Sequence, residues 1–200
     1  MVRLLKGYET KMKNKNNISE KKLKKSEKAS NKILNEIFFY SRVILTALII
    51  TFAVNNYIAV SAKVPTGSME TTVMPGDRII INRLAYLKEY PKRGDIISFD
   101  FPDDTTKNYL KRIMALPNET IEGRDGIIYI NGEPFTDDYT SIVINDDFGP
   151  YTVPENCYFV MGDNRNNSFD SRYWIHKFVS FDSIVGKAEF SYYPTFKILD

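Results

Sequence analysis

Cysteine, histidine and tryptophan each occur only once in this 200-residue chain. A single cysteine, Cys157, excludes a disulfide within the chain. It lies in a stretch that is typical of a strand, 156–160, so we expect a small core residue and not a thiol nucleophile. The single histidine, His176, leaves a Ser-His-Asp triad with one candidate base. We expect His176 to be a surface residue or a local hydrogen bonder, and a lysine base has to be considered first for any serine chemistry.

Charge is unevenly distributed along the chain. Residues 1–42 contain 12 Lys/Arg and 4 Asp/Glu, a balance of +8, whereas residues 43–200 contain 15 and 21, a balance of −6. The basic segment directly precedes an apolar run, and cytoplasmic flanks of membrane helices carry an excess of Lys/Arg. The alternative is a solvated or nucleic-acid-binding tail, but the segment lacks interleaved aromatic residues. We predict a basic cytoplasmic tail over residues 1–36 and no nucleic-acid partner.

The apolar run Val43–Val60 contains 18 residues and no charge. As a helix it would be about 27 Å long, close to the ~30 Å hydrocarbon core of a bilayer. We predict one transmembrane helix over residues 37–60, with a cytoplasmic N-terminus and residues from about 61 onward outside the membrane. The alternative is a removable signal peptide cut near Val60-Ser61-Ala62. Because the preceding basic region is far longer than a usual leader, we expect the anchor to be retained.

Beyond residue 61 the chain consists of short apolar stretches separated by turn signals. These stretches predict strands at Arg78–Asn82, Asp95–Phe101, Asn108–Ala115, Thr120–Glu122, Gly126–Ile130, Tyr151–Val153, Cys157–Met161 and Lys187–Tyr192. Asn131-Gly132 predicts a hairpin turn. One short helix is expected near Ser180–Ile184, with a possible second around Leu84–Leu87. The prediction is a mainly β fold, with a core of residues 61–117 and 157–200 and a small inserted lobe of residues 118–156.

Ser68 is a candidate nucleophile. It follows the predicted membrane segment by about eight residues and lies in Pro65-Thr66-Gly67-Ser68-Met69, a turn shaped by proline and glycine. Glycine permits a backbone conformation that a substrate can approach closely. A serine beside a glycine is usually only a turn residue, so this segment alone does not identify a site.

Lys111 is a candidate general base. Within a predicted strand, Tyr109, Lys111 and Ile113 share one face, whereas Leu110 and Arg112 share the other. A lysine aligned with an aromatic and a β-branched side chain would be partly desolvated, which lowers its pKa. A neutral amine near the working pH can remove a proton from a serine hydroxyl. The alternative is an ordinary surface lysine on an edge strand.

The third feature is a polar block, residues 161–172, with the sequence Met-Gly-Asp-Asn-Arg-Asn-Asn-Ser-Phe-Asp-Ser-Arg. Asp170 and Arg172 are two residues apart, so in an extended stretch they could form an ion pair. The block could also be only a polar loop. Its spacing does not follow the calcium-loop pattern of alternating acidic residues closed by a glutamate, so we expect no metal.

Together these segments resemble the bacterial type I signal peptidases, membrane-bound Ser/Lys proteases that remove signal peptides from exported proteins. The resemblance covers about residues 40–192. It is carried in order by Val64–Met69 with Gly76-Asp77, by Arg93–Phe99, by Tyr109–Ile113, and by Met161–Ser168 with Asp170-Ser171-Arg172. It implies an antiparallel β catalytic core with an inserted β lobe, no metal or cofactor, and cleavage after small-x-small sites. Its partners would be signal peptides and the lipid bilayer, and we expect a monomer.

The resemblance also implies roles for individual residues. Ser68 would be the nucleophile and Lys111 the base, Ser168 would orient the lysine amine, and the Thr66 hydroxyl would join the Ser68 N–H in an oxyanion hole. An ion pair beneath the site and shallow pockets for small side chains complete the set: Asp170 and Arg172 for the pair, and Val64, Val73, Tyr109 and Leu110 for the pockets.

Two positions depart from the family pattern. Thr71 stands where a proline is usual, and Ile175-His176 where a glycine is common. We expect the first change to affect loop rigidity and not the reacting groups, and the second to alter a turn near the site. Two other functions remain open, a peptidase dedicated to pilin or conjugation substrates and a non-catalytic anchored scaffold. A cytosolic self-cleaving repressor is disfavoured, because it would need a DNA-binding domain where this chain has an apolar run.

Overall fold

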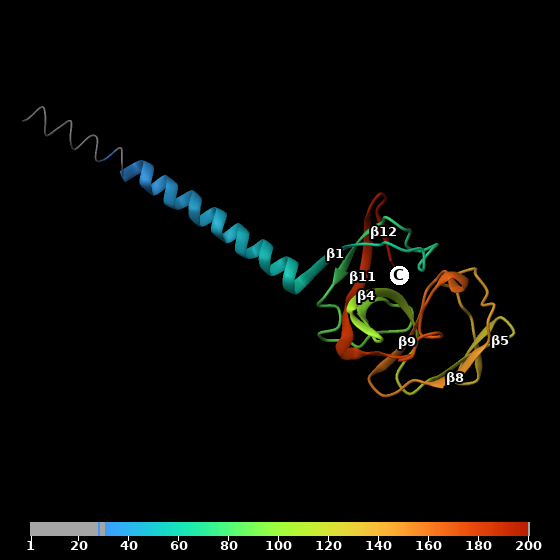
Figure 1. The fold of residues 1–200 in the computed structure, drawn as a ribbon. Helices are drawn as coiled ribbons and strands as arrows, with labels where there is room; N and C mark the ends of the chain where they lie inside the picture. The colour runs from blue at the N-terminus through green and yellow to red at the C-terminus, as the bar shows by residue number, and fades with distance from the viewer. Residues whose placement is uncertain (1–27, 29–30, 200) are drawn as a thin grey trace, which may run out of the picture. The chain divides into compact units, whose positions relative to one another are not determined.

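The computed structural model describes Lys28 and residues 31–199. The chain forms two compact units that divide after Phe52, and each is described by itself. Most of the basic tail predicted for residues 1–36 lies outside the described residues. Within the second unit, residues 53–200, the described elements are mainly antiparallel strands (Figure 1).

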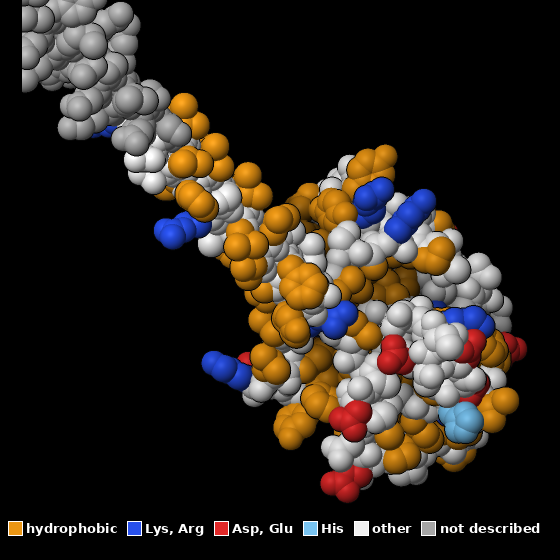
Figure 2. Space-filling model, turned by 60° about the vertical axis from the view of Figure 1, so that its left-hand side comes forward, with side chains coloured by type: hydrophobic (Ala, Val, Ile, Leu, Met, Phe, Trp, Pro, Cys, Tyr) orange, Lys and Arg blue, Asp and Glu red, His pale blue; other side chains and the backbone are white. Residues whose placement is uncertain are grey.

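One helix in the described part of the chain, Asn31–Ile58, is long and apolar enough to cross a membrane. Hydrophobic side chains follow it along its length (Figure 2), and its last turn, η1 (Val54–Ile58), is π-helical. The helix begins before the predicted residue 37 and ends before the predicted residue 60. Ala59 is already extended, with φ −144° and ψ 143°, because it begins a strand. Sequence periodicity alone could not separate the end of the apolar run from this strand.

The larger sheet contains eight strands in the order β1-β2-β11-β3-β4-β9-β10, with β12 paired to β11. Its strands are β1 (Ala59–Lys63), β2 (Arg78–Asn82), β3 (Ile96–Phe101), β4 (Asp104–Ala115), β9 (Cys157–Met161), β10 (Val179–Ser180), β11 (Ile184–Tyr193) and β12 (Lys197–Ile198). Every pair in it is antiparallel. β3 and the second half of β4 are buried, and β4 lies between β3 and β9, so side chains of β4 lie deep in the unit.

The smaller sheet has the order β7-β6-β5-β8 and lies within residues 118–156. Its strands are β5 (Thr120–Arg124), β6 (Ile127–Ile130), β7 (Glu133–Phe135) and β8 (Phe148–Thr152). Asn131 and Gly132 join β6 to β7 with φ of 53° and 82°. Both angles fit the two-residue hairpin turn that Asn-Gly predicts, and the turn is therefore confirmed.

The helices predicted within the second unit are largely absent. Near Ser180–Ile184 there is only a three-residue 3₁₀ turn, η3 (Phe181–Ser183), and Leu84–Leu87 forms turns and no helix. A second 3₁₀ turn, η2 (Arg165–Asn167), lies in the polar block. Segments this short have too few internal hydrogen bonds to form a helix without tertiary support, and here their backbone conformation is determined by the strands on either side.

Three groups of buried apolar side chains support the strands. One joins the smaller sheet to β4 and β9, one lies around β1, β2 and the segment after β1, and one joins β3, β4 and β9 to Trp174. The second group includes Met69 and Val73, whose side chains are 1% and 0% exposed. This packing fixes the two ends of the segment that carries Ser68.

Candidate active site

A cavity of about 790 Å³ opens on the larger sheet. It is bounded by the end of β1 and the following segment, by β2, by β4, and by the polar block. Its lining includes Ala62, Val64, Thr66, Ser68, Met69, Ile79, Ile81, Tyr109, Leu110, Lys111, Asn167 and Ser168. Segments that are far apart in sequence therefore meet at one hollow.

Ser68 lies on the segment that links β1 to β2. The segment closes on itself, because Val64 N donates to Asp77 O at 2.9 Å and Gly76 N donates to Val64 O at 2.8 Å. The polar block holds it from the other side, since Asn164 N donates to Ser68 O at 3.1 Å. Asn164 Nδ2 also donates to Gly67 O at 3.0 Å. The Ser68 backbone is thus fixed through both strand pairing and the block.

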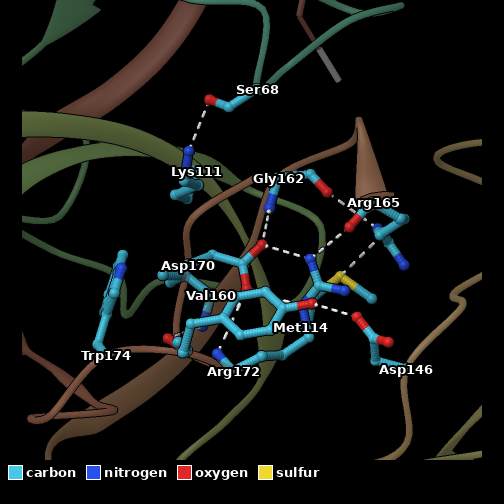
Figure 3. A network of polar contacts seen from close by, with 12 residues as sticks. Ser68, Lys111, Met114, Asp146, Val160, Gly162, Arg165, Asp170, Arg172 and Trp174 are labelled. Carbon is cyan, nitrogen blue, oxygen red and sulfur yellow. Dashed lines mark hydrogen bonds and ion pairs between the residues drawn. The ribbon is translucent and has the colours of Figure 1, made fainter. Parts of the chain in front are cut away.

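Lys111 lies in β4, opposite Ile97 of β3. Its side chain reaches into the cavity and its Nζ lies 2.6 Å from Ser68 Oγ (Figure 3). The residue is only 4% exposed. The pKa of Lys111 is lowered to about 8, mainly by burial; the charges of Asp170 and Asp163 oppose this shift, and the charge of Arg172 adds to it. A substantial neutral fraction near neutral pH is what a general base requires.

The next residue of β4, Arg112, faces away from Ser68, as strand alternation predicts. Its guanidinium is 1% exposed and binds Asp163 through both carboxylate oxygens, Nε–Oδ1 at 2.9 Å and Nη2–Oδ2 at 2.8 Å. Thr72 Oγ1 donates to the same carboxylate. This pair joins β4 to the polar block and to the segment that carries the serine.

Asp170 and Arg172 form a second buried pair, with Arg172 Nε 2.8 Å from Asp170 Oδ1. Asp170 Oδ2 also accepts a hydrogen bond from Gly162 N at 3.0 Å, and Arg172 Nη2 donates to Arg165 O at 2.6 Å (Figure 3). The pair therefore fastens the two halves of the block to each other. Neither side chain has a hydrogen bond to Ser68 or Lys111 among the described contacts.

Ser168 lines the cavity but forms no bond to Lys111. Its Oγ is buried and has no hydrogen-bond partner among the described residues. Ser168 and the Ser68 backbone pack closely against Gly162. A Cβ at this position would lie 2.3 Å from both Ser168 Oγ and Ser68 O. The site thus holds an unpartnered hydroxyl next to the serine backbone.

The other predicted site residues fall in two places. Thr66, Val64, Tyr109 and Leu110 all line the cavity. Val73 is fully buried in the apolar group beneath the segment and does not line the cavity, so it supports the site from below. A valine is equally suited to a pocket wall and to a core position, so the sequence could not show which of the two Val73 occupies.

His176 and Cys157 lie outside the cavity. The His176 side chain is 73% exposed and its Nδ1 lies 2.8 Å from Asp103 Oδ1, which confirms a surface residue with a local hydrogen bond. Cys157 begins β9 and is half-buried against the first apolar group, and burial raises the pKa of its thiol. Among the described residues, no group of three or more His, Cys, Asp or Glu could hold a metal ion.

Sequence reasoning missed three residues that shape the site: Asp163, Asn164 and Gly162. Their only sequence signal was membership of the polar block. Each acts through contacts with Arg112, Gly67 or Ser68, which are about 50 to 100 residues away in the chain. No local pattern reports pairing over such distances.

Comparison with known proteins agrees with these observations. The family model described as "Signal peptidase, peptidase S26" matches residues 37–193. Signal peptidase I T of Bacillus subtilis strain 168 is 33% identical over 189 residues, which cover 88% of this chain and 96% of that protein. Signal peptidase I S of the same strain is 35% identical over 182 residues, 85% and 95% of the two chains.

A probable signal peptidase I-2 of Synechocystis is 34% identical over 159 residues, 76% of this chain and 72% of that protein. A crystal structure of a signal peptidase I from Enterococcus faecalis V583 shares 38% identity, covers 50% of this chain and 97% of the other, and aligns with a TM-score of 0.43. The match to the family model extends from the apolar helix to β11 and includes the whole cavity. The chain therefore belongs to the signal peptidase family, peptidase S26.

Proposed function

We propose that this protein is a signal peptidase I that cuts preproteins with Ser68 as nucleophile and Lys111 as general base. The observation that carries the proposal is the 2.6 Å separation of Ser68 Oγ and a buried Lys111 Nζ in an open cavity. The lowered pKa of Lys111 supports it, because the amine has to be neutral to accept a proton. Signal peptides as substrates follow from the family and from the names of its relatives.

In the first half-reaction, neutral Lys111 accepts the Ser68 proton as Ser68 Oγ attacks the scissile carbonyl. The Ser68 N–H and the Thr66 hydroxyl would donate to the oxyanion, and such a donor is worth about 3 kcal/mol in comparable enzymes. The Lys111 ammonium then gives its proton to the leaving amine. The products of this step are the free mature chain and a signal peptide esterified to Ser68.

In the second half-reaction, Lys111 accepts a proton from water, which attacks the ester and frees the signal peptide. Ser68 is restored when the Lys111 ammonium returns a proton to its Oγ. The unpartnered Ser168 hydroxyl supports a role in orienting the amine, because a buried hydroxyl gains most from a new hydrogen bond. No step in this scheme needs a metal or a cofactor.

An extended peptide would bind in the cavity. β1 pairs only with β2 among the described strands, so its other edge, beside the cavity, has backbone groups available for an added strand. Val64, Tyr109 and Leu110 would line shallow pockets that admit small side chains at positions −1 and −3.

The membrane context completes the proposal. The helix Asn31–Ile58 would be a retained single-pass anchor, with the Lys/Arg-rich residues before it in the cytoplasm and residues from 61 onward on the outer side. The enzyme would act as a monomer.

The test is cleavage of a purified preprotein in detergent by the wild type and by Ser68→Ala, with the new N-terminus sequenced. We expect a cut after a small-x-small site in the wild type and none in the variant. Cleavage that persists in a folded Ser68→Ala sample would exclude Ser68 as the nucleophile. Absence of cleavage by a folded wild type would count against the activity itself.

A further inference from the structure

The segment 136–147, which links β7 to β8 in the inserted lobe, lies against the polar block. Asn166 Nδ2 donates to Val143 O at 2.9 Å, and Asn145 N donates to Asn166 Oδ1 at 3.1 Å. The side-chain amide of Asn166 is therefore bonded to the lobe through both of its polar atoms. These bonds join the lobe to the block two residues before Ser168, which lines the cavity.

An ion pair makes a further connection between the lobe and the block. Both Nη atoms of Arg165 donate to the Asp137 carboxylate, Nη2 to Oδ1 at 3.1 Å. The Arg165 side chain is fully buried, whereas that of Asp137 is 20% exposed. A buried guanidinium has lost its hydration and needs a negative charge beside it. Among the described residues, Asp137 is the only acidic side chain paired with Arg165.

Arg165 also contacts the part of the block that packs against the nucleophile. Its Nε donates to Gly162 O at 3.0 Å, and its carbonyl accepts from Arg172 Nη2 at 2.6 Å (Figure 3). Gly162 in turn packs against Ser168 Oγ and Ser68 O. The chain of contacts from the inserted lobe to the backbone of the nucleophile thus has only two intermediate residues, Arg165 and Gly162.

We propose that Asp137 is a positioning residue for the cleavage reaction and acts from the inserted lobe through Arg165. The Asp137 carboxylate compensates the buried charge and thereby keeps Arg165 Nε bonded to Gly162 O. Without the carboxylate the guanidinium would move toward water, and the block beside Ser68 would lose its fixed position. The inference rests on the proposed function, since it assigns a role in that reaction, but the position of the block can be measured without cleavage.

Asp138 supplies a matched control. It is the next residue of the same segment, carries the same charge and is exposed. Among the described residues, nothing forms a hydrogen bond or ion pair with it. A general effect of negative charge near the cavity would appear on neutralising either residue, whereas an effect through Arg165 would appear only at Asp137.

The first experiment measures steady-state cleavage of one signal-peptide substrate in detergent by full-length wild type, Asp137→Asn and Asp138→Asn, with kcat expressed per folded enzyme. A shift of about 1 Å at a reacting group can cost 10²-fold in rate, so we expect kcat of Asp137→Asn to fall by about tenfold or more, with KM within about twofold of the wild type. Asp138→Asn is expected to match the wild type. An equal loss in both variants, or a loss confined to KM, would overturn the proposal.

A double-mutant cycle tests whether Asp137 acts through Arg165. Arg165→Met removes the buried charge, so Asp137→Asn should lower kcat much less in that background than in the wild type. An equal loss in both backgrounds would overturn the proposal. Arg165→Met alone is also expected to lower kcat, because Gly162 O loses its donor. Wild-type kcat in a folded Arg165→Met would overturn the proposal even where Asp137→Asn alone does not fold.

A readout that needs no cleavage separates this proposal from the proposed function. Asn164 N donates to Ser68 O, so exchange of its amide hydrogen with deuterium reports on the position of the block. We expect the peptide that contains Asn164 to exchange several-fold faster in Asp137→Asn than in the wild type and Asp138→Asn, with exchange in β2 unchanged. Unchanged exchange at Asn164 would overturn the proposal. Absence of cleavage by a folded wild type would instead bear on the proposed function alone.

Discussion

At the scale of single residues, we expect Lys111 to determine how activity depends on pH. Its pKa of about 8 arises mainly from burial, so the neutral form increases as the pH rises through 8. We therefore expect kcat/KM for a short peptide to rise from pH 6 to about 9 and then to level off. A pH profile measured in detergent checks this, and a profile that is flat or falls over that range would contradict the assignment of Lys111 as base.

The burial of Lys111 is also expected to lower the free energy of unfolding. The folded pKa of Lys111 lies below the unfolded value, so between about 8 and 10.4 the unfolded chain binds more protons and wild-type stability rises with pH. Below pH 8 the folded protein holds a buried charge. Lys111→Met should therefore abolish cleavage yet raise the free energy of unfolding at pH 7, by on the order of 3 kcal/mol, with a smaller gain above pH 10.

Thermal or denaturant unfolding at the two pH values measures this gain. Lys107→Met is the matched control, because the Lys107 side chain is 61% exposed and its charge remains hydrated. A Lys111→Met protein that is less stable than the wild type at pH 7 would show that the buried charge of Lys111 does not destabilise the folded protein.

Gly162 tests how tightly the serine and the block are packed. An added Cβ would lie 2.3 Å from Ser68 O and from Ser168 Oγ, so Gly162→Ala has to displace one of them. A shift of about 1 Å at a reacting group can cost 10²-fold in rate, and we expect a loss of about that size in kcat/KM. Unchanged kinetics in Gly162→Ala would mean that the Ser68 backbone is free to adjust.

At the scale of elements, the polar block positions the segment that carries the serine. Asn164 Nδ2 donates to Gly67 O at 3.0 Å and to Glu70 Oε2 at 3.2 Å, and its backbone N binds Ser68 O. Asn164→Ala removes only the side-chain bonds. We expect kcat to fall by about tenfold with little change in KM, since each lost bond is worth about 1 kcal/mol.

Asn82→Ala is the matched control. It also removes a side-chain amide, whose Nδ2 donates to Glu189 Oε1 at a distance of 3.0 Å, and Asn82 does not line the cavity. Steady-state kinetics of both variants on one peptide shows whether the fall in kcat is specific to Asn164. An equal fall in kcat in the two variants would assign the effect to general loosening of the fold.

The elements also differ in how far the sequence could predict them. β2, β3, β4, β9 and β11 contain runs of apolar or β-branched residues, and strands were predicted there. β1 was missed because its apolar residues continue the run of the helix, and β12 because two residues carry no periodicity. Ser68 and Lys111 could be proposed from short motifs, whereas the Arg112–Asp163 pair depends on contacts made only by folding.

At the scale of the whole molecule, the chain combines an apolar helix with a β unit that contains the site. The family match covers both, which suggests a membrane-anchored peptidase. The cavity is lined by residues from β1, β4 and the polar block, which are about 50 residues or more apart in sequence. Ser68 and Lys111 both precede the inserted sheet in sequence, whereas the polar block that holds the Ser68 backbone follows it.

The central claim is that Ser68 becomes covalently attached to the signal peptide. The most direct measurement is to mix the full-length enzyme with a preprotein in detergent, stop the reaction with acid after a short time, and determine peptide masses by mass spectrometry. We predict that the peptide that contains Ser68 gains the mass of the signal peptide less one water, and that Ser68→Ala shows no such species. Cleavage with the added mass on another residue would contradict the account.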